Sequence, residues 1–347
     1  MITSRKIWTL AGIVLAILIL TAVIIELVEK PKIAEEQTGK TQKTEEPAET
    51  EIMEIKIANV PRIFPYFPFF VAQQKDFFEA NGLRVEFELP ETADAIKALV
   101  EKEVDYISSS PSAIKTSLEE ASMRSIMALT SSSHHFLVIQ PGLELKDLKT
   151  IGVNSPSSGS HYQALKLIEE NDIPATISFL GNNPAQHITA LLEGSVDGAL
   201  LTPPYVFLLQ ENGFTVLEPS SDVRIMFSGL TARNDKIENN PEEARRIIKA
   251  LRSAIEFIGT NPQGTKDLLF EYFELEKDET NEKVVENTYL FTKQFFSEKG
   301  TLDEETMRKV IQFAKTEQFT SFEDVKNQSV SPEDIAKVFD FSLLAEE

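Results

Sequence analysis

Short runs with β-strand character alternate with runs of helical periodicity through most of the chain. Strands separated by helices are typical of βαβ units, in which helices cover a parallel sheet. The expected strands are residues 54–60, 84–89, 104–108, 125–129, 136–140, 150–154, 176–179, 198–201, 215–218 and 223–231. The helices expected between them are residues 72–81, 93–102, 112–121, 160–171, 184–193 and 204–212.

A purely helical pattern follows the last of these strands. Its expected helices are residues 241–260, 261–273, 283–298, 303–316 and 332–339. The alternation of strands and helices comes in two series, and helices alone follow them. This pattern predicts an α/β fold with two lobes.

The most apolar segment lies at the N-terminus. Residues 7–25 form a run of 19 positions without a charged side chain, and at a helical rise of about 1.5 Å each they span roughly 28 Å, close to the hydrocarbon thickness of a bilayer. Arg5 and Lys6 precede the run and acidic residues follow it, so the positive-inside rule places residues 1–6 in the cytoplasm. We therefore expect residues 7–25 to be an uncleaved transmembrane signal anchor of a single-pass cell-membrane protein whose bulk is extracytoplasmic. A cleaved signal peptide is the alternative.

The segment after this run has a different composition. Residues 26–51 are rich in Glu, Lys, Thr and Pro and contain few apolar side chains. Such a segment cannot bury enough apolar surface to offset the entropy that ordering would remove. It is therefore predicted to be a flexible linker between the anchor and the folded part of the chain.

Charge and composition narrow the classes of function. The chain has 55 acidic against 34 basic residues, a formal net charge of −21, and no cysteine. The acidic balance disfavours nucleic acid as a partner, because phosphate backbones are bound by concentrated basic surface. Without cysteine there is no thiolate metal ligand and no cysteine nucleophile, and the four histidines lack the spacing of a metal site. Dinucleotide-binding and serine-hydrolase motifs are missing from the sequence, so we expect no cofactor, no metal and no enzyme activity.

Four segments occur in an order that is typical of one family. Residues 67–88 (FPFFVAQQKDFFEANGLRVEFE) combine a short aromatic, proline-containing loop with a helix that ends in a Phe, Glu, Gly, Leu, Val pattern. Residues 147–173, 190–217 and 239–263 follow in the expected order. The chain thus resembles the periplasmic solute-binding proteins of ABC importers, of the nitrate, sulfonate and taurine type, which also includes binding proteins for thiamine precursors.

Two positions depart from that family. Asp76 stands where the family usually has glycine, next to a helix end. Thr202-Pro203 stands where many members have Glu-Pro, so a carboxylate that could hold an amine is missing. A taurine-like ligand is therefore not supported.

The resemblance implies two α/β lobes of the type II periplasmic-binding-protein fold, with a ligand in the cleft between them and closure by hinge motion. Lobe 1 would comprise residues 52–133 and 229–347, lobe 2 would comprise residues 134–228, and the hinges would lie at 131–135 and 227–230. The implied function is the extracytoplasmic capture of a small anionic or planar solute and its delivery to the permease and ATPase of an importer.

Two other classes of function stay open at this point. One is a membrane-anchored domain that senses a ligand or interacts with a partner. The other is an enzyme on the same fold, although the thiamine-pyrimidine synthases of this superfamily depend on a cysteine-rich segment and this chain has no cysteine.

Loops that follow the predicted strands hold the candidate ligand-binding residues, because ligands of open α/β sheets lie beyond the carboxyl ends of the strands. In residues 61–67, aromatic rings can cover a planar ligand and a guanidinium can pair with an anion. Serine-rich loops at 108–112 and 154–161 can offer hydroxyls and helix N–H groups to an oxyanion. The candidates are Arg62, Phe64, Tyr66, Phe67, Ser109, Ser110, Ser112, Thr130, Ser131, Ser157, Ser158, Gly159, Ser160, His161, Thr202 and Tyr205. Core packing and helix capping by the same residues are the alternatives.

Overall fold

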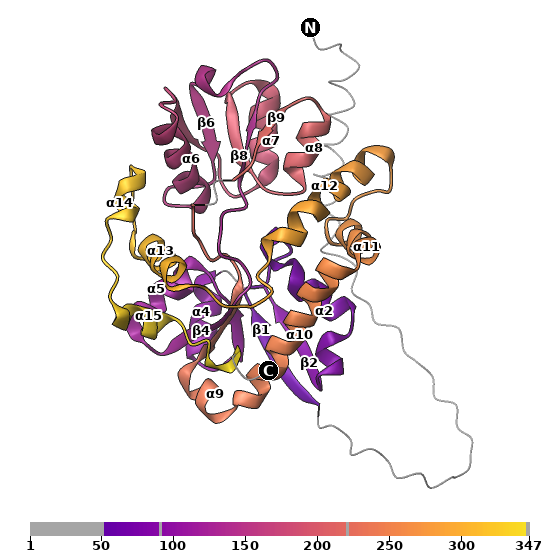
Figure 1. Ribbon diagram of the computed structural model, residues 1–347, viewed down its shortest axis with the longest axis vertical. Coiled ribbons are helices and arrows are strands. Elements are labelled where there is room, and N and C mark those ends of the chain that lie inside the picture. Colours follow the sequence, from indigo (N-terminus) through magenta and orange to yellow (C-terminus); the bar gives the residue numbers. More distant parts are fainter. Residues whose placement is uncertain (1–51, 90–91, 220–221, 345–347) are drawn as a thin grey trace, which may run out of the picture. The chain divides into compact units, whose positions relative to one another are not determined.

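The computed structural model describes residues 52–89, 92–219 and 222–344, which belong to one compact unit (Figure 1). The predicted anchor and linker, residues 7–25 and 26–51, lie outside the described residues. Within the described part of the chain, no helix is both long and apolar enough to cross a membrane.

The first of two five-stranded sheets has the strand order β2-β1-β3-β10-β4. Its strands are β1 Met53–Ala58, β2 Leu83–Glu88, β3 Tyr106–Ser108, β4 Met123–Ala128 and β10 Gly229–Arg233. Strand β1 pairs in parallel with β2 and β3, whereas β10 pairs antiparallel with β3 and β4. A strand from late in the chain therefore completes a sheet that the first part of the chain begins.

The second sheet has the order β7-β6-β8-β5-β9. Its strands are β5 Phe136–Ile139, β6 Thr150–Val153, β7 Thr176–Phe179, β8 Gly198–Leu201 and β9 Thr215–Leu217. Strand β6 is parallel to β7 and β8, and β5 is antiparallel to β8 and β9. The predicted two-lobe α/β fold is confirmed, but both sheets are mixed, because the strands that follow each crossing between the sheets, β5 and β10, run against their neighbours.

Helices surround both sheets and continue to the C-terminal part of the chain (Figure 1). Those that alternate with strands are α2 Phe67–Gln74, α3 Phe77–Ala80, α4 Thr92–Val100, α5 Pro111–Glu120, α6 Gly159–Glu170, α7 Pro184–Glu193 and α8 Tyr205–Glu211. Those after the last strand are α9 Asn234–Asn239, α10 Pro241–Thr260, α11 Pro262–Tyr272, α12 Glu279–Phe295, α13 Glu304–Lys315, α14 Phe322–Lys326 and α15 Pro332–Val338. Single 3-10 turns lie at Phe64–Tyr66, Leu145–Asp147 and Ser342–Leu344.

Two predicted elements differ from the structure. The helix expected at 72–81 is divided into α2 and α3, because Asp76 has a left-handed backbone with φ 55° that interrupts a right-handed helix. The strand expected at 223–231 begins only at Gly229. Val223 and Ile225, which precede it, are instead buried in an apolar cluster with Tyr162 and Leu165 of α6.

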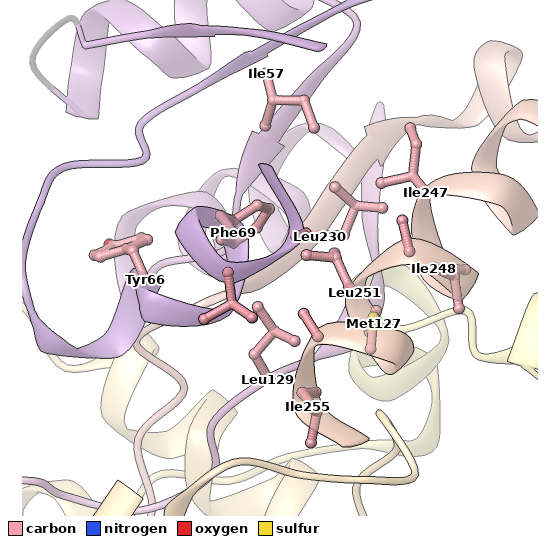
Figure 2. Packing of buried hydrophobic residues seen from close by; sticks show 14 of the residues in the cluster. Ile57, Tyr66, Phe69, Met127, Leu129, Leu230, Ile247, Ile248, Leu251 and Ile255 are labelled. Atoms are coloured by element: carbon pink, nitrogen blue, oxygen red, sulfur yellow. The ribbon is translucent and has the colours of Figure 1, made fainter. Parts of the chain in front are cut away.

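The core of the first lobe forms where α10 packs on the first sheet (Figure 2). Ile247, Leu251 and Ile255 follow one another at intervals of four residues, so they share one face of the helix. They belong to the same buried cluster as Leu230 of β10 and Phe69 of α2. Burying such a side chain contributes about 1.5–3 kcal/mol, so this packing holds β10 and α2 in a fixed relation.

The C-terminal helices contact both lobes. The ring of Phe291 in α12 lies 4.9 Å from that of Phe136 in β5, and Phe322 in α14 stacks on Tyr162 of α6 at 4.9 Å. The assignment of all residues from 229 to 347 to lobe 1 stays a prediction.

Candidate functional site

A cavity of about 190 Å³ lies where strand ends of the two lobes face each other. It is bounded by the loop after β1, the start of β5, the loops after β6 and β7, and the end of β8. Its lining residues are Arg62, Ile63, Phe64, Pro65, His134, His135, Asn154, Asn182, Pro184, His187, Leu200, Leu201, Thr202, Pro203, Tyr205 and Phe273. Strands β1, β6, β7 and β8 all contribute through their carboxyl ends, which is the position expected for a ligand in an open α/β sheet.

Three buried histidines give this cavity its polar character. His134, His135 and His187 are 4%, 6% and 1% exposed. Burial holds the pKa of His134 well below its ordinary value, and the adjacent His135 adds to the effect. Burial, assisted by His187, lowers the pKa of His135 to about 3. Burial also lowers the pKa of His187, although carbonyl groups of Gly181 and Leu200 act in the opposite direction. All three imidazoles are therefore neutral near pH 7.

Hydrogen bonds orient two of these imidazoles. Nε2 of His187 lies 2.8 Å from the carbonyl oxygen of Gly181, and because a carbonyl only accepts, Nε2 carries the proton. Nδ1 of His135 lies 3.3 Å from Oγ of Ser133, which also accepts a hydrogen bond from the His135 backbone N–H. Nδ1 of His134 is shielded from solvent and has no hydrogen-bond partner among the described residues. It is a buried polar atom that a bound solute can satisfy.

Arg62 lies at the edge of the cavity, but its guanidinium is engaged by the chain. Its Nε donates to the carbonyl of Tyr272 at 2.8 Å, and its Nη2 donates to the carbonyl of Glu271. Its Nη1 forms an ion pair with Glu274 at 3.1 Å, and the guanidinium carbon lies over the ring of Phe70 at 5.4 Å. Arg62 therefore holds the C-terminal end of α11 through carbonyl groups that the helix itself leaves unpaired.

Phe64 links the cavity to the C-terminal helices. Its ring lies 6.0 Å from His134 and 5.5, 5.2 and 5.8 Å from Phe291, Phe295 and Phe296. Offset and tilted aromatic pairs of this kind stabilise the arrangement of the rings beyond the burial of their area. The aromatic side of the cavity is thus held from α12 as well as from the loop after β1.

Four of the candidate residues line the cavity, namely Arg62, Phe64, Thr202 and Tyr205. Burial, with a smaller effect of Glu274, raises the pKa of Tyr205, so its hydroxyl is neutral. Thr202 directly follows β8, and Tyr205 begins α8. They add hydroxyl groups to the lobe 2 side of the cavity.

Asn154 is the residue of the serine loop at 154–161 that lines the cavity. The polar groups of this loop form hydrogen bonds with one another. Oγ of Ser158 accepts from the N–H of His161 at 3.2 Å and so caps α6. Oγ of Ser160 accepts from the N–H of Asn154 at 3.0 Å, and the N–H of Ser157 donates to Nδ1 of His161 at 3.1 Å. The capping alternative accounts for these contacts, and anion binding by this loop stays a prediction.

Two further candidates lie at the connections between the lobes, of which the first runs from β4 to β5 and the second from β9 to β10. A Cβ atom at Gly159 would lie 2.6 Å from Cζ of Phe227, so glycine is needed here for close packing against the second connection. Oγ1 of Thr130 accepts from the N–H groups of Phe227 and Ser228 at 3.0 and 3.1 Å. Thr130 therefore joins the two connections to each other, and Ser131 lies half-buried beside it.

The remaining candidates lie inside or at the edge of lobe 1. Ser109 bonds to Thr231 at 2.7 Å within the first sheet, Ser110 caps α5, and Ser112 is exposed. Tyr66 and Phe67 belong to the buried core. None of these five is among the residues that line the cavity, and their role as ligand contacts stays a prediction.

Several lining residues were missed by the sequence reasoning. His134, His135 and His187 were considered only as metal ligands, and among the described residues no group of three or more histidine and acidic side chains could hold a metal ion. Asn154 and Asn182 follow β6 and β7 closely, so the strand-end rule contained the signal for them. His134 and His135 precede β5 and had no such signal, because they reach this edge only through the antiparallel direction of that strand. Phe273 comes from the end of α11 and had no such signal.

The fold and the position of the cavity define the class of protein. Two mixed sheets joined by two connections, with a cavity between facing strand ends, make the two-lobe periplasmic-binding-protein fold. The sulphonate-binding protein SsuA of Escherichia coli shares it with a TM-score of 0.60 at 17% identity, over 76% of this chain and 85% of that protein. The nitrate-binding protein NrtA of Synechocystis shares it with a TM-score of 0.55 at 12% identity, over 85% and 88%.

A family profile described as NMT1/THI5 like matches residues 64–265, which is more than half of the chain. The chain belongs to this family, and the resemblance found in the sequence is confirmed. A Brucella abortus protein named as a binding protein is 24% identical over 217 residues, which cover 60% of this chain and 67% of that protein. The relatives are named as binding proteins and not as enzymes, in agreement with the expected class.

Proposed function

We propose that the chain is the solute-capturing component of an ABC-type importer, and that the solute is small, neutral and planar. The observation that carries this proposal is the cavity itself, which both lobes line and whose three imidazoles are uncharged. In this arrangement a solute contacts both lobes at once, so its binding favours the closed arrangement of the lobes.

The charge of the lining argues for a neutral solute. Arg62 is the one formally charged residue among the sixteen that line the cavity, and its guanidinium is engaged by Glu271, Tyr272 and Glu274. A nitrate or sulfonate group placed among the imidazoles would lose its hydration without gaining an opposite charge, which is strongly unfavourable. SsuA and NrtA are named as binding proteins for sulphonate and nitrate, which are anions. The lining of this cavity favours a neutral solute instead.

The shape and polar groups of the cavity argue for a small planar molecule. A volume of about 190 Å³ is below the roughly 300–1,000 Å³ of sites for drug-sized ligands. The rings of Phe64, Tyr205 and Phe273 provide flat apolar surface, and the amides of Asn154 and Asn182 provide both donors and acceptors. A heteroaromatic or amide-bearing ring satisfies this combination.

Delivery to a membrane permease and its ATPase follows from the class of protein and belongs to the same proposal. The predicted anchor at residues 7–25 would keep the captured solute close to the membrane. The energy for uptake would then come from the ATPase, because binding in the cleft alone moves no solute across the membrane.

A thermal-melting panel on the full chain in a neutral detergent tests the neutral-solute proposal. The panel contains pairs of compounds that differ mainly in charge: nicotinamide and nicotinate, and benzamide and benzenesulfonate. Pyrimidines and nitrate are added to the panel. A ligand at 100 times its dissociation constant stabilises by about 2.7 kcal/mol, which for a chain of this size raises the melting temperature by several degrees. We expect shifts only with neutral members of the panel.

Site variants connect any shift to the cavity. Tyr205→Phe removes a hydroxyl that lines it, and Tyr162→Phe, on α6 and outside the lining, is the matched control. We expect the first variant to weaken binding roughly tenfold, as for one lost hydrogen bond, and the second to leave binding unchanged. Stabilisation by nitrate or benzenesulfonate but not by the amides would refute the neutral-solute proposal, and equal effects of the two variants would place the solute elsewhere.

A further inference from the structure

A second cavity lies at the opposite end of the first sheet. It has a volume of about 590 Å³ and is lined by residues before β1 and β2, by α10 and by Leu343. Ile52 and Gly82 immediately precede the two strands, whereas the cleft lies beyond the carboxyl ends. Six residues of β1 span about 20 Å, so a molecule in this cavity does not touch a solute in the cleft.

Basic side chains of α10 dominate the lining of this second cavity. They are Arg245, Arg246, Lys249 and Arg252. Spacings of three and four residues put positions 245, 249 and 252 on the same face of the helix. Among the described residues that line the cavity, Glu79 and Glu242 are the acidic ones. Four positive against two negative side chains make a local positive excess in a chain whose net charge is −21.

The contacts of these side chains keep the basic groups together. Glu242 accepts from Nε of Arg246 at 3.1 Å and lies 4.0 Å from Nη1 of Arg245, so one carboxylate is shared by two guanidinium groups. Nη2 of Arg252 donates to the carbonyls of Lys299 and Leu344 at 3.1 and 3.2 Å, which fixes its position. Lys249 is exposed on the same helix. Clustered cations beside a low-dielectric wall concentrate the local field and attract anions even to a protein of negative net charge.

The rest of the lining is apolar and gives the cavity room for more than an inorganic ion. Ile52, Ala80, Ile248 and Leu343 contribute apolar surface next to the basic groups. Guanidinium groups match the oxygens of a phosphate in a two-point geometry, and an ammonium adds a point charge. The combination fits an anionic head on a small organic body.

We propose that this cavity is a second binding site, remote from the cleft, for a phosphate group carried on a small organic molecule. The charge selects a phosphate, and the apolar lining selects the organic part. The same chemistry is offered by a soluble phosphate ester and by the headgroup of an anionic phospholipid.

Protection of Lys249 from acetylation gives a readout at the site. The full chain in a neutral detergent is acetylated with a limiting reagent, and the modified lysines are quantified by mass spectrometry with glycerol 3-phosphate, with glycerol, and with sodium chloride at matched ionic strength. We expect glycerol 3-phosphate to lower the acetylation of Lys249 at least threefold, with no change at Lys309 or Lys337 on α13 and α15.

In a separate arm, phosphatidylglycerol and phosphatidylcholine are mixed into the micelles. Protection by the soluble ester identifies a soluble ligand, and protection by phosphatidylglycerol alone identifies a lipid headgroup.

Variants test whether the basic groups cause the protection. Arg246→Gln, which leaves Lys249 available as the reporter, should weaken the apparent affinity roughly tenfold, as for one lost charge-assisted contact, whereas Arg246→Lys should retain part of it. Lys309→Gln is the matched control and should have no effect, and melting temperatures show that each variant is folded. Equal protection by sodium chloride, an unchanged affinity in folded Arg246→Gln, or no protection in either arm would overturn the proposal. Because these readouts do not use the cleft, they are independent of the transport proposal.

Discussion

Acid should destabilise this protein through His135, and His135→Gln should remove most of that effect. In the folded chain, burial and the neighbouring His187 lower the pKa of His135 to about 3, whereas an unfolded chain has a histidine pKa of about 6.5. The unfolded state therefore takes up the proton first as the pH falls. The stability linked to this group is fully present above pH 6.5 and is lost progressively from there towards pH 3.

The size of this loss of stability follows from the difference between the pKa values of His135 in the folded and unfolded chain. At pH 4.5 the solution is about two units below the unfolded pKa and still above the folded one, so the loss from this single group is about 2.7 kcal/mol, at 1.36 kcal/mol for each unit. His134, whose ring lies 4.6 Å from that of His135, is also kept neutral by burial. It should add to the loss in the same direction.

Urea unfolding of the full chain in a neutral detergent, at several pH values between 7.5 and 4.5, measures this effect. The wild type and His135→Gln are compared at each pH, because the carboxyl groups common to both then cancel. His161→Gln is the matched control, since burial alone lowers the pKa of His161, without the second imidazole that adds to the effect at His135, and His161 lies outside the cavity. We expect the difference in unfolding free energy between wild type and His135→Gln to change by about 2.7 kcal/mol over this range, and the difference for His161→Gln to change less. Parallel pH profiles for wild type and His135→Gln would refute the neutral-imidazole argument, and with it the main support for a neutral solute.

Three other substitutions test contacts at and near the cleft. Gly159→Ala places a Cβ 2.6 Å from Cζ of Phe227, so we expect a loss of about 1–3 kcal/mol, measured by urea unfolding; an unchanged midpoint would mean that Phe227 moves freely. Thr130→Val removes the acceptor for two backbone N–H groups of the second connection and should lose about 1–3 kcal/mol, whereas Thr130→Ser should retain most of the stability. Ser158→Ala removes the cap of α6 and should lose about 0.5–2 kcal/mol without changing solute affinity. Weaker binding of an anion by Ser158→Ala would instead support the serine loop as part of the site.

The order of elements was predictable because it depends on local patterns. Strands such as β6 and β8 and helices such as α7 and α10 follow from short apolar runs and from periodic apolar positions. The divided helix at Asp76 and the late start of β10 were not predictable in this way. The late start of β10 depends on what surrounds the segment, since Val223 and Ile225 are buried against α6 without any strand pairing.

The candidate site was predictable in position but only partly in composition. The rule that ligands lie beyond strand ends selected Phe64, Thr202 and Tyr205, which line the candidate cavity. The same rule also selected the serine loops. A residue after a strand can either face a cleft or cap the next helix, and the sequence pattern is the same in both cases. Hydroxyls such as that of Ser158 took the second role, since the N–H groups at the start of a helix need an acceptor.

The charge preference of the cleft depends on contacts that no local pattern contains. An arginine next to an aromatic loop predicts an anion partner, but Arg62 finds its partners at the end of α11, about 210 residues later in the chain. Once its guanidinium is held there, the remaining polar groups of the cavity are imidazoles, amides and hydroxyls. Burial then decides the charge of the imidazoles, because a buried histidine away from carboxylates loses its proton. In the proposed function, a site that the sequence suggests for an anion is neutral because three contacts hold Arg62 at the end of α11. Arg62→Ala should therefore loosen the end of α11 without abolishing binding of a neutral solute.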